Sequence, residues 1–376
     1  MIGLLTFHWA DDYGAMLQAY ALKRYLEKAG RSVEFIPYAP VKLTGRYWWC
    51  PLAASEQEGK LRYWPSRSGW KRNLALGGDF WKRKRAMCRF RRQRLAPPPK
   101  RGLKRISLEK YSCVFVGSDQ VWNPVITVGL DSAYLGNLPG KESCRLVSYA
   151  ASFGASALPA EAAGTFAEAV GKNFAAVSVR ERRAAPFLSS LLRREVEDAL
   201  DPVLLLEREE WERLGNRPAE EGYILVYSAE YNEPMLRYAQ QLARRLQIKA
   251  VQISMPLRGK LPEGIELRVQ GGPAEFVGYL QNAACVLTNS FHGTAFSVLL
   301  EKPFFAFRHS FLNARLEDLL EKLGLQARIR TEPPPLDSGE LWEAVDWAGV
   351  RERLDAERAR SGRFIQENLR ERGEPS

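Results

Sequence analysis

The feature that most constrains the fold is the repeated alternation of short apolar runs with longer amphipathic stretches. The apolar runs predict strands at residues 2–7, 33–37, 113–117, 145–150 and 176–179, then at 223–228, 250–254, 265–269, 285–288 and 303–307. Apolar residues at helical spacing predict helices at 15–29, 160–171, 233–246, 274–282, 293–301 and 313–323. Because strands that alternate with helices form parallel sheets covered on both faces, the pattern predicts an α/β protein.

The two series of strands predict two domains, since a chain of 376 residues is too long for one compact core. We expect a Rossmann-like N-terminal domain over residues 1–210 and a Rossmann-like C-terminal domain over residues 211–340. The polar stretch 201–222 has the composition of a linker, and residues 341–376 are expected to form a helix that packs back across the domains. In folds of this kind ligands bind at the carboxyl ends of the strands, so polar residues there are the candidate site residues.

Positive charge is concentrated in residues 60–105, which hold 17 basic residues and one acid, while the whole chain has a net charge of +11. Trp81, Cys88 and Leu95 fall seven apart, which predicts a helical insertion in the first domain with an apolar stripe and a cationic remainder. Two interpretations stay open: a solvated helix docked on the domain, and a surface that meets anionic lipid or a lipid-linked sugar. Nucleic acid is not expected as a partner, because no recognised binding module accompanies the charge.

Polar residues follow two predicted strands of the first domain. Asp12 lies after the first strand, where it either caps the next helix or forms one wall of a substrate site. Asp119, Gln120 and Trp122 follow the third strand and together offer groups that hydrogen-bond to a sugar and stack on it. A capped turn with a locally packed Trp122 has the same composition.

Arg180 stands at the end of the predicted strand 176–179. One interpretation is an arginine paired with Glu181 or another neighbouring acid. The other is an anion-binding residue, because the planar guanidinium suits a carboxylate or a phosphate.

The strongest candidate site lies at the end of the strand 285–288, where Asn289, Ser290, His292 and Gly293 lead into a helix. His292 is one of only three histidines in the chain. Backbone N–H groups at a helix start attract an anion, and an adjacent phosphate would hold the imidazole protonated and ready to donate. This position favours a catalytic role over a structural one.

Two arginines follow the neighbouring strand 303–307. Arg308 and Arg315 either complete a cationic pocket beside His292 or are surface charges at helix ends.

The rest of the composition points to a protein of the cytoplasm. Five scattered cysteines without a CxxC pair favour neither a disulfide framework nor a structural zinc site. No run approaches the roughly 18 apolar residues that cross a bilayer. We therefore expect a cytoplasmic location, with peripheral association at the inner membrane face.

Six blocks of sequence occur in a fixed order, at residues 7–22, 117–123, 148–154, 179–181, 201–205 and 288–294. Together they resemble the polysaccharide pyruvyl transferase family over roughly residues 1–325, interrupted by the basic segment. The resemblance implies two facing Rossmann-like domains of GT-B-like architecture. It also implies transfer of a pyruvyl group from phosphoenolpyruvate to a sugar of a cell-surface glycan or its lipid-linked precursor, with formation of a ketal and release of phosphate. This reaction requires no metal or redox cofactor, so none is expected.

The resemblance assigns roles to individual residues. The catalytic histidine of the family matches His292, and its donor-binding arginine matches Arg180. Characterised relatives carry an arginine two positions before the histidine, where this chain has Ser290, so Arg308 and Arg315 are candidates to neutralise the donor instead. The expected phosphoenolpyruvate site is Arg180, Asn289, Ser290, Gly293, Arg308 and Arg315, and the expected acceptor site is Asp12, Tyr13, Gln18, Asp119, Gln120 and Trp122.

Two other functions stay open from the sequence. A GT-B glycosyltransferase would use a nucleotide sugar and bind UDP or a similar nucleotide in the second domain. A catalytically silent glycan-binding protein would bind glycan without releasing phosphate.

Overall fold

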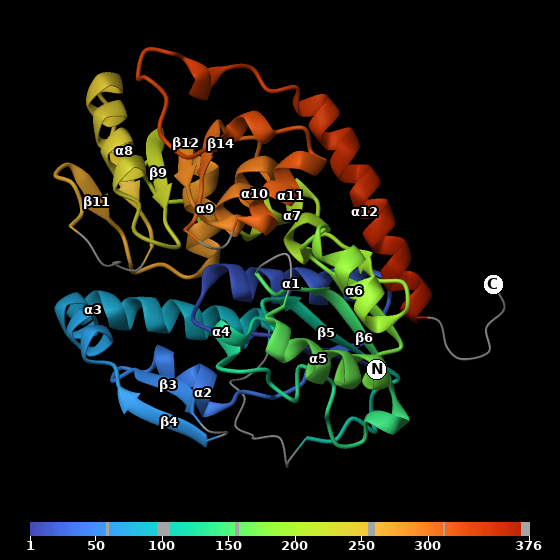
Figure 1. Ribbon diagram of the computed structural model, residues 1–376. Coiled ribbons are helices and arrows are strands. Elements are labelled where there is room, and N and C mark those ends of the chain that lie inside the picture. Colours follow the sequence, from blue (N-terminus) through green and yellow to red (C-terminus); the bar gives the residue numbers. More distant parts are fainter. Residues whose placement is uncertain (58–59, 96–105, 155–157, 255–259, 311–312, 370–376) are drawn as a thin grey trace. The chain divides into compact units, whose positions relative to one another are not determined.

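The computed structural model describes residues 1–57, 60–95, 106–154, 158–254, 260–310 and 313–369, which form two compact units (Figure 1). Unit 1 comprises Met1–Leu76, Cys88–Leu205 and the described residues from Ala356 onward. Unit 2 comprises Gly77–Met87 and Leu206–Asp355. In these described ranges, no helix is both long and apolar enough to span a membrane.

Unit 1 is built on a six-stranded parallel sheet in the order β2-β1-β5-β6-β7-β8. The strands are β1 (Ile2–Leu5), β2 (Val33–Phe35), β5 (Cys113–Asp119), β6 (Arg145–Ala151), β7 (Ala176–Val179) and β8 (Glu197–Asp198). The first five confirm the predicted strands; β8 is only two residues long and carries no apolar run. The unit also contains α1 (Tyr13–Lys28), α2 (Val41–Thr44), α4 (Pro124–Thr127), α5 (Ala160–Asn173), α6 (Ala184–Leu192) and the short helical turns η1 (Gly45–Tyr47), η4 (Lys141–Ser143) and η5 (Pro202–Leu204).

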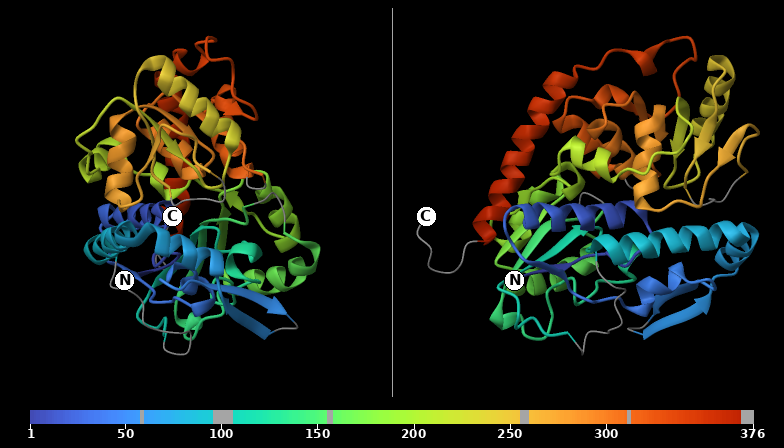
Figure 2. Two further views of the ribbon diagram at one scale, coloured as in Figure 1. Left: turned by 90° about the vertical axis from the view of Figure 1, so that its left-hand side faces the viewer. Right: turned by 180° about the vertical axis from the view of Figure 1, so that it is seen from behind.

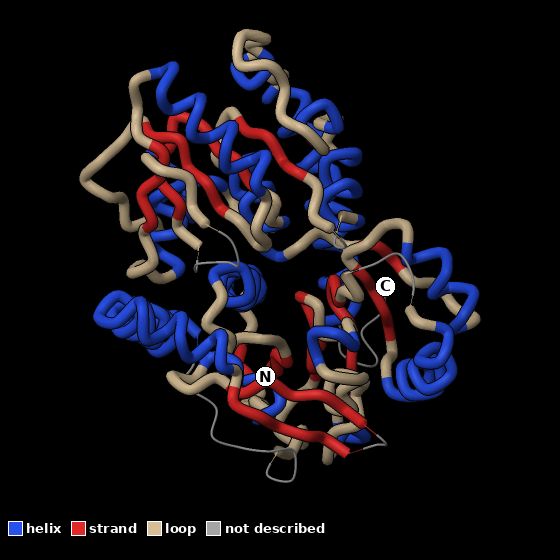
Figure 3. The backbone as a smooth tube through the Cα atoms, turned by 60° about the vertical axis from the view of Figure 1, so that its left-hand side comes forward, coloured by secondary structure: helices blue, strands red, loops and turns tan. Residues whose placement is uncertain are grey.

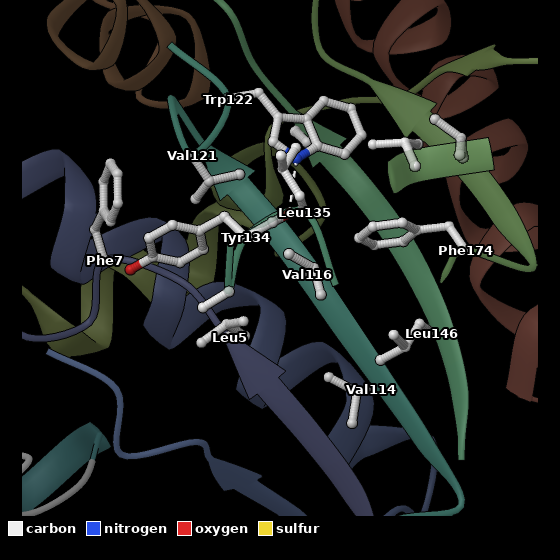
Figure 4. Packing of buried hydrophobic residues seen from close by; sticks show 14 of the residues in the cluster. Leu5, Phe7, Val114, Val116, Val121, Trp122, Tyr134, Leu135, Leu146 and Phe174 are labelled. Atoms are coloured by element: carbon white, nitrogen blue, oxygen red, sulfur yellow. Dashed lines mark hydrogen bonds between the residues drawn. The ribbon is translucent and has the colours of Figure 1, made fainter. Parts of the chain in front are cut away.

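The core of unit 1 lies between the sheet and its helices (Figure 4). Val114 and Val116 from β5 and Leu146 from β6 are buried there, as apolar strand residues are expected to be. Trp122, just after β5, meets the rings of Phe166 and Phe174 edge-on, at centroid distances of 4.9 and 6.0 Å. These aromatic contacts hold the loop after β5 against the helical layer.

The basic segment has a more varied structure than the predicted helix. Its first part, β4 (Lys60–Pro65), pairs antiparallel with β3 (Leu52–Gln57), so the helical prediction is wrong for these residues. The helix α3 (Arg67–Phe90) and the following turn η2 (Arg91–Leu95) confirm the prediction for the next part. Gly77 interrupts α3 with a φ of 45°, where the chain passes from unit 1 to unit 2. Residues 96–105 lie outside the described residues.

Unit 2 contains a second six-stranded parallel sheet, in the order β11-β10-β9-β12-β13-β14 (Figure 3). Its strands are β9 (Tyr223–Tyr227), β10 (Ala250–Gln252), β11 (Ile265–Leu267), β12 (Ala283–Thr288), β13 (Phe304–Phe307) and β14 (Ile329–Arg330). Its helices are α7 (Arg208–Leu214), α8 (Glu233–Leu246), α9 (Pro273–Asn282), α10 (Phe291–Leu299) and α11 (Ala314–Lys322), with η6 (Gln326–Arg328) and η7 (Glu340–Trp342). All five strands predicted for the second series are present, and α7 occupies part of the stretch predicted as a linker.

The C-terminal helix α12 (Trp347–Leu369) contributes to both units. In unit 2 its first turns bury Val350 and Leu354. In unit 1 its later turns carry Arg360, whose guanidinium lies 2.6 Å from the carboxylate of Asp198.

Both sheets have a topological switch point, where the chain leaves the middle of the sheet in opposite directions. In unit 1 it lies between β1 and β5, and in unit 2 between β9 and β12. Ligands of doubly wound sheets bind at the carboxyl ends of the strands at this point. The candidate residues that follow β1, β5 and β12 therefore lie where a site is expected.

Candidate active site

The start of α10 is held tightly against the sheet at the switch point of unit 2. The Thr288 hydroxyl donates to the backbone oxygen of Tyr227 (2.6 Å) and accepts from the backbone N–H of Ser290 (3.0 Å). A Cβ on Gly293 would lie 2.3 Å from the Thr288 oxygen. Glycine at this position is therefore what allows the first turn of α10 to approach β12 so closely.

His292 lies in the first turn of α10 and is 8% exposed. Its ring meets the ring of Phe291 edge-on at 5.3 Å. Ser290 is the N-cap residue, but its side chain makes no capping hydrogen bond. The first turn thus combines an imidazole with the backbone N–H groups of a helix start, which is the arrangement that suits a bound anion.

Arg315 and His309 lie beside this helix start. The Arg315 side chain is buried, with its guanidinium carbon 5.4 Å from the centre of the Phe291 ring. Burial lowers the pKa of His309; the Glu230 carboxylate, 3.6 Å from its Nε2, opposes this effect and the Arg315 charge adds to it. Arg315 is therefore the predicted donor-binding cation that the structure brings to the start of α10.

Two other predicted donor-site residues are engaged in contacts within unit 2. The Asn289 amide accepts from the backbone N–H of Ala229 (2.7 Å) and donates to the backbone oxygen of Glu230 (2.9 Å), which fixes the loop after β9. Arg308 is partly exposed and forms an ion pair with Glu317. Their contact with a donor stays a prediction.

Sequence reasoning missed Ser228, which directly follows β9. It lies beside Asn289, because Tyr227 pairs with Thr288 in the parallel register. Its hydroxyl is buried and has no hydrogen-bond partner among the described residues. The signal that could have identified it in the sequence is a serine placed immediately after a buried strand. A buried hydroxyl without a hydrogen-bond partner costs free energy of folding unless a ligand or a water binds it.

In unit 1 the structure brings Asp12 and Asp119 to the switch point around Tyr47. The Asp12 carboxylate caps α1 by accepting from the backbone N–H of Ala15 (2.9 Å). Burial raises the pKa of Tyr47, and the Asp12 carboxylate raises it further. The Arg46 charge opposes this shift, whereas the carboxylates of Asp11 and Asp119 add to it. The Tyr47 phenol is thus within electrostatic reach of carboxylates from both loops, and sequence reasoning had not selected it.

An arginine of the basic segment holds the loop after β1. The Arg91 guanidinium lies 2.6 Å from the Asp11 carboxylate, in a pair that is about 9% exposed on each side. It also donates to the backbone oxygens of His8 (3.3 Å) and Trp9 (2.8 Å). This part of the segment positions the candidate acceptor loop.

Three predicted acceptor residues are buried, which corrects the expectation for them. The Trp122 indole is fully buried and donates to the backbone oxygen of Tyr134 (2.9 Å), so it offers no face for a sugar. The fully buried Gln18 amide donates to the Thr6 hydroxyl (2.9 Å) and accepts from the Ser118 hydroxyl (2.5 Å). Tyr13 is also buried, at 2% exposure. These side chains face inward because α1 and the loop after β5 pack against the sheet.

The other two candidates of the loop after β5 are less enclosed. The Asp119 carboxylate accepts from the backbone N–H of Gln120 (2.8 Å), and the Gln120 side-chain oxygen accepts from the Asn123 amide (2.7 Å). Asp119 adopts a φ of 104°, which is unusual for a residue with a side chain. Contact of these residues with a sugar stays a prediction.

Arg180 forms a buried ion pair with Asp201, whose carboxylate lies 2.9 Å from the guanidinium. The side chains are 2 and 0% exposed. The acid that faces Arg180 is thus Asp201. Glu181 accepts instead from the Ser152 hydroxyl and the backbone N–H of Gly154. Donor binding by Arg180 stays a prediction.

His8 is a structural residue whose burial makes stability depend on pH. Its ring stacks on Phe35 at 4.8 Å, its Nδ1–H donates to the backbone oxygen of Thr6 (3.1 Å), and burial lowers its pKa to about 4. Between pH 6.5 and 4 the unfolded chain binds a proton that the folded chain excludes, so stability falls as the pH falls. We expect wild type to lose about 2 kcal/mol more than His8→Asn between pH 7 and 4.5, measured by urea unfolding. Equal losses would contradict this prediction.

Among the residues that the structure describes, no group of three or more His, Cys, Asp or Glu side chains is arranged to hold a metal ion.

Comparison with known proteins places the chain in a family. The sequence model of the polysaccharide pyruvyl transferase family matches residues 12–310. No curated protein matches the chain by sequence.

Several solved structures are similar to the chain at low sequence identity. The UDP-GlcNAc 2-epimerase from Neisseria meningitidis, bound to UDP-GlcNAc, is 11% identical, with 98% of each chain covered and a TM-score of 0.50. The Streptomyces nogalater glycosyltransferase SnogD is 13% identical over 98% of each chain, with a TM-score of 0.41. The Escherichia coli heptosyltransferase WaaC with ADP is 12% identical over 98% of this chain and 100% of that chain, with a TM-score of 0.40.

The two parallel sheets confirm the predicted α/β class with two Rossmann-like units, and the fold is similar to that of the Neisseria meningitidis UDP-GlcNAc 2-epimerase. Because the family match covers most of the sequence, including His292, the chain belongs to the polysaccharide pyruvyl transferase family.

Proposed function

We propose that the protein transfers a pyruvyl group from phosphoenolpyruvate to two hydroxyls of one sugar and releases phosphate. The observation that carries this proposal is the start of α10, where His292 occupies the first turn and the buried Arg315 packs on Phe291. This is a cationic, largely enclosed site at a topological switch point. It suits a small donor with two anionic groups.

Phosphoenolpyruvate carries a phosphate and a carboxylate, so its site needs more than one source of positive potential. The N–H groups of the first turn of α10 supply one, and Arg315 supplies a second. Arg315 replaces the arginine that relatives carry at the position of Ser290, because it reaches the same helix turn from the start of α11. Ser228 completes the site as a neutral hydrogen-bond donor at the end of β9.

The reaction balances without a cofactor or metal. His292 donates a proton to the methylene carbon of the donor, which makes C2 cation-like. The first sugar hydroxyl attacks C2, the C–O bond to phosphate breaks, and the second hydroxyl closes the ketal. Two hydroxyl protons are lost; one balances the proton placed on carbon and the other leaves with phosphate. An imidazole suits the donor role because its ordinary pKa lies near 6.5.

The acceptor is a sugar of a cell-surface glycan or of its lipid-linked precursor, bound in unit 1. Asp12, Asp119 and Tyr47 meet at the switch point there and offer carboxylates and a phenol, the groups that recognise sugar hydroxyls. The protein acts in the cytoplasm, in peripheral contact with the inner face of the membrane.

Calorimetric titration of phosphoenolpyruvate tests the donor assignment. We expect wild type to bind phosphoenolpyruvate, and Arg315→Gln to weaken binding about tenfold or more, because a buried charge-assisted contact contributes about 1.5–3 kcal/mol. The matched control is Arg351→Gln, which removes an exposed arginine of unit 2 that pairs with Glu301. It is expected to leave the affinity unchanged.

UDP serves as the competing ligand in the same titration, because several solved structures of this fold hold nucleotides or nucleotide sugars. Tight UDP binding without binding of phosphoenolpyruvate would favour a nucleotide-sugar glycosyltransferase. Glycan binding without phosphate release from phosphoenolpyruvate would favour a silent glycan-binding protein.

A further inference from the structure

The β3–β4 hairpin and the first half of α3, both in unit 1, expose a group of large apolar side chains. Their exposed fractions run from 40 to 55%, far above those of the core. The set is Leu61, Tyr63, Trp64, Trp70 and Leu74, and we call it the hairpin patch. A cluster of this kind on a soluble surface marks an interaction site.

The register of the hairpin explains why these side chains are uncovered. Tyr63 pairs with Ala54 and Trp64 with Ala53, so small residues lie opposite the two rings. The rings project from opposite faces of the hairpin, because successive side chains of a strand alternate. β3 packs against α2 and η1, whereas every residue of β4 is exposed. Figure 2 shows the hairpin as a two-stranded ribbon that projects from the rest of unit 1.

Buried polar contacts tie α3 to the chain that leads into the hairpin. The Asn73 amide, 1% exposed, donates to the backbone oxygens of Trp48 (3.2 Å) and Trp49 (3.0 Å). The backbone N–H of Ser66 donates to the backbone oxygen of Pro51 (2.7 Å). Trp70 and Leu74 thus belong to a helix that is anchored to the chain entering the hairpin.

The charge around the hairpin patch is predominantly positive, although the exposed Glu56 of β3 pairs with Leu61 across the hairpin. Residues 60–76 contain no acid, and their basic residues are Lys60, Arg62, Arg67, Lys71 and Arg72. A second copy of the chain would bring like charges together, which disfavours self-association through this surface. Single-stranded nucleic acid would use the aromatic rings but not Leu61 and Leu74, because bases stack only on planar groups.

We propose that the hairpin patch docks on an anionic lipid bilayer. Tryptophan and tyrosine settle at the level of the lipid headgroups, the leucines enter the acyl boundary, and the basic side chains meet the anionic headgroups. The inference deepens the proposed function by placing unit 1 next to the membrane, where a lipid-linked sugar is presented. Membrane docking itself requires neither donor nor acceptor.

The surface assigned to docking is the hairpin rather than the run Lys82–Arg85, which belongs to unit 2. In that run Arg83 is buried and Lys82 pairs with Asp79 at 3.2 Å. Fewer basic side chains of α3 beyond Gly77 are therefore available to contact a membrane than their number in the sequence suggests.

Co-sedimentation of the full chain with vesicles tests the proposal. Vesicles of phosphatidylcholine with about one third phosphatidylglycerol are compared with phosphatidylcholine alone, at low and high salt. We expect binding to the anionic vesicles only, with a partition coefficient that falls at least tenfold in Trp64→Ala/Trp70→Ala. Lys60→Gln/Arg62→Gln is expected to lower it about 30-fold, since each basic residue near the surface contributes about 1 kcal/mol.

Matched variants separate the hairpin from other exposed groups. Trp342→Ala removes an equally exposed tryptophan of unit 2, and Lys82→Gln/Arg85→Gln removes two charges of α3 beyond Gly77. Both are expected to change the partition coefficient less than threefold. Circular dichroism spectra and thermal midpoints like those of wild type confirm that all variants fold, as expected for exposed positions.

Several results would overturn the docking proposal. One is a partition coefficient of Trp64→Ala/Trp70→Ala equal to that of wild type, and another is a larger loss of vesicle binding in Lys82→Gln/Arg85→Gln than in the hairpin variants. Tighter binding of wild type to a single-stranded oligonucleotide than to vesicles would also overturn it. So would a dimer, seen in sedimentation velocity, that the Trp64→Ala/Trp70→Ala substitutions dissociate. Because these assays contain no sugar or phosphoenolpyruvate, a failed pyruvyl transfer assay leaves their outcome unaffected.

Discussion

Replacing His292 with asparagine is expected to lower kcat of pyruvyl transfer about 10²- to 10⁴-fold, the usual contribution of a positioned general acid. The substitution removes the proton donor but keeps a polar side chain of similar size in the first turn of α10. Backbone N–H groups and Arg315 remain in place, so the affinity for phosphoenolpyruvate is expected to change only a few-fold. Phosphate release at saturating donor and acceptor, together with calorimetric donor binding, measures the two effects separately.

His309 provides the matched control, because it is a second histidine close to Arg315. Burial lowers its pKa, so its imidazole is largely neutral near pH 7 and is poorly suited to donate a proton there. His309→Asn is therefore expected to retain kcat within about fivefold of wild type. Full turnover in His292→Asn, or an equal loss in His309→Asn, would contradict the assignment of the acid to His292.

The fold was predictable from the sequence because its central strands are nearly pure apolar runs. β1, β5, β9 and β12 are buried on both faces. Strands of this kind are recognisable in a sequence as continuous apolar runs, without an alternation of apolar and polar residues. The edge strands β8 and β14 are only two residues long and have no such signal. The β3–β4 hairpin was missed because the helical spacing of Trp81, Cys88 and Leu95 was extended to the whole basic segment.

The position of the site was predictable for a different reason. The carboxyl ends of strands at a switch point are fixed by topology, so Asp12, Asp119 and His292 could be selected before any geometry was known. Burial of individual side chains was not predictable. Trp122 and Gln18 are residue types that commonly bind sugars, and they differ from binding residues only in the direction that their side chains face. Tyr47 and Ser228 were missed because their role depends on neighbours distant in sequence.

The buried pair of Arg180 and Asp201 carries the second large expected effect. Removing one partner of such a pair leaves an uncompensated charge in the protein interior, which costs about 3–5 kcal/mol. We expect Arg180→Met to destabilise unit 1 by this amount, measured by urea unfolding at neutral pH. A loss below about 1 kcal/mol would contradict a buried, uncompensated Asp201 carboxylate.

A second substitution separates stability from donor binding. The Asp201 carboxylate also accepts from the backbone N–H of Val203 (2.9 Å), a contact that asparagine retains. Arg180→Met/Asp201→Asn is therefore expected to recover stability to within about 1–2 kcal/mol of wild type, because neither buried charge remains. With the fold restored, the affinity of the double variant for phosphoenolpyruvate reports on the Arg180 guanidinium alone. Weakened binding would assign Arg180 to the donor site in addition to its structural role, whereas wild-type binding would leave donor recognition to Arg315 and the start of α10.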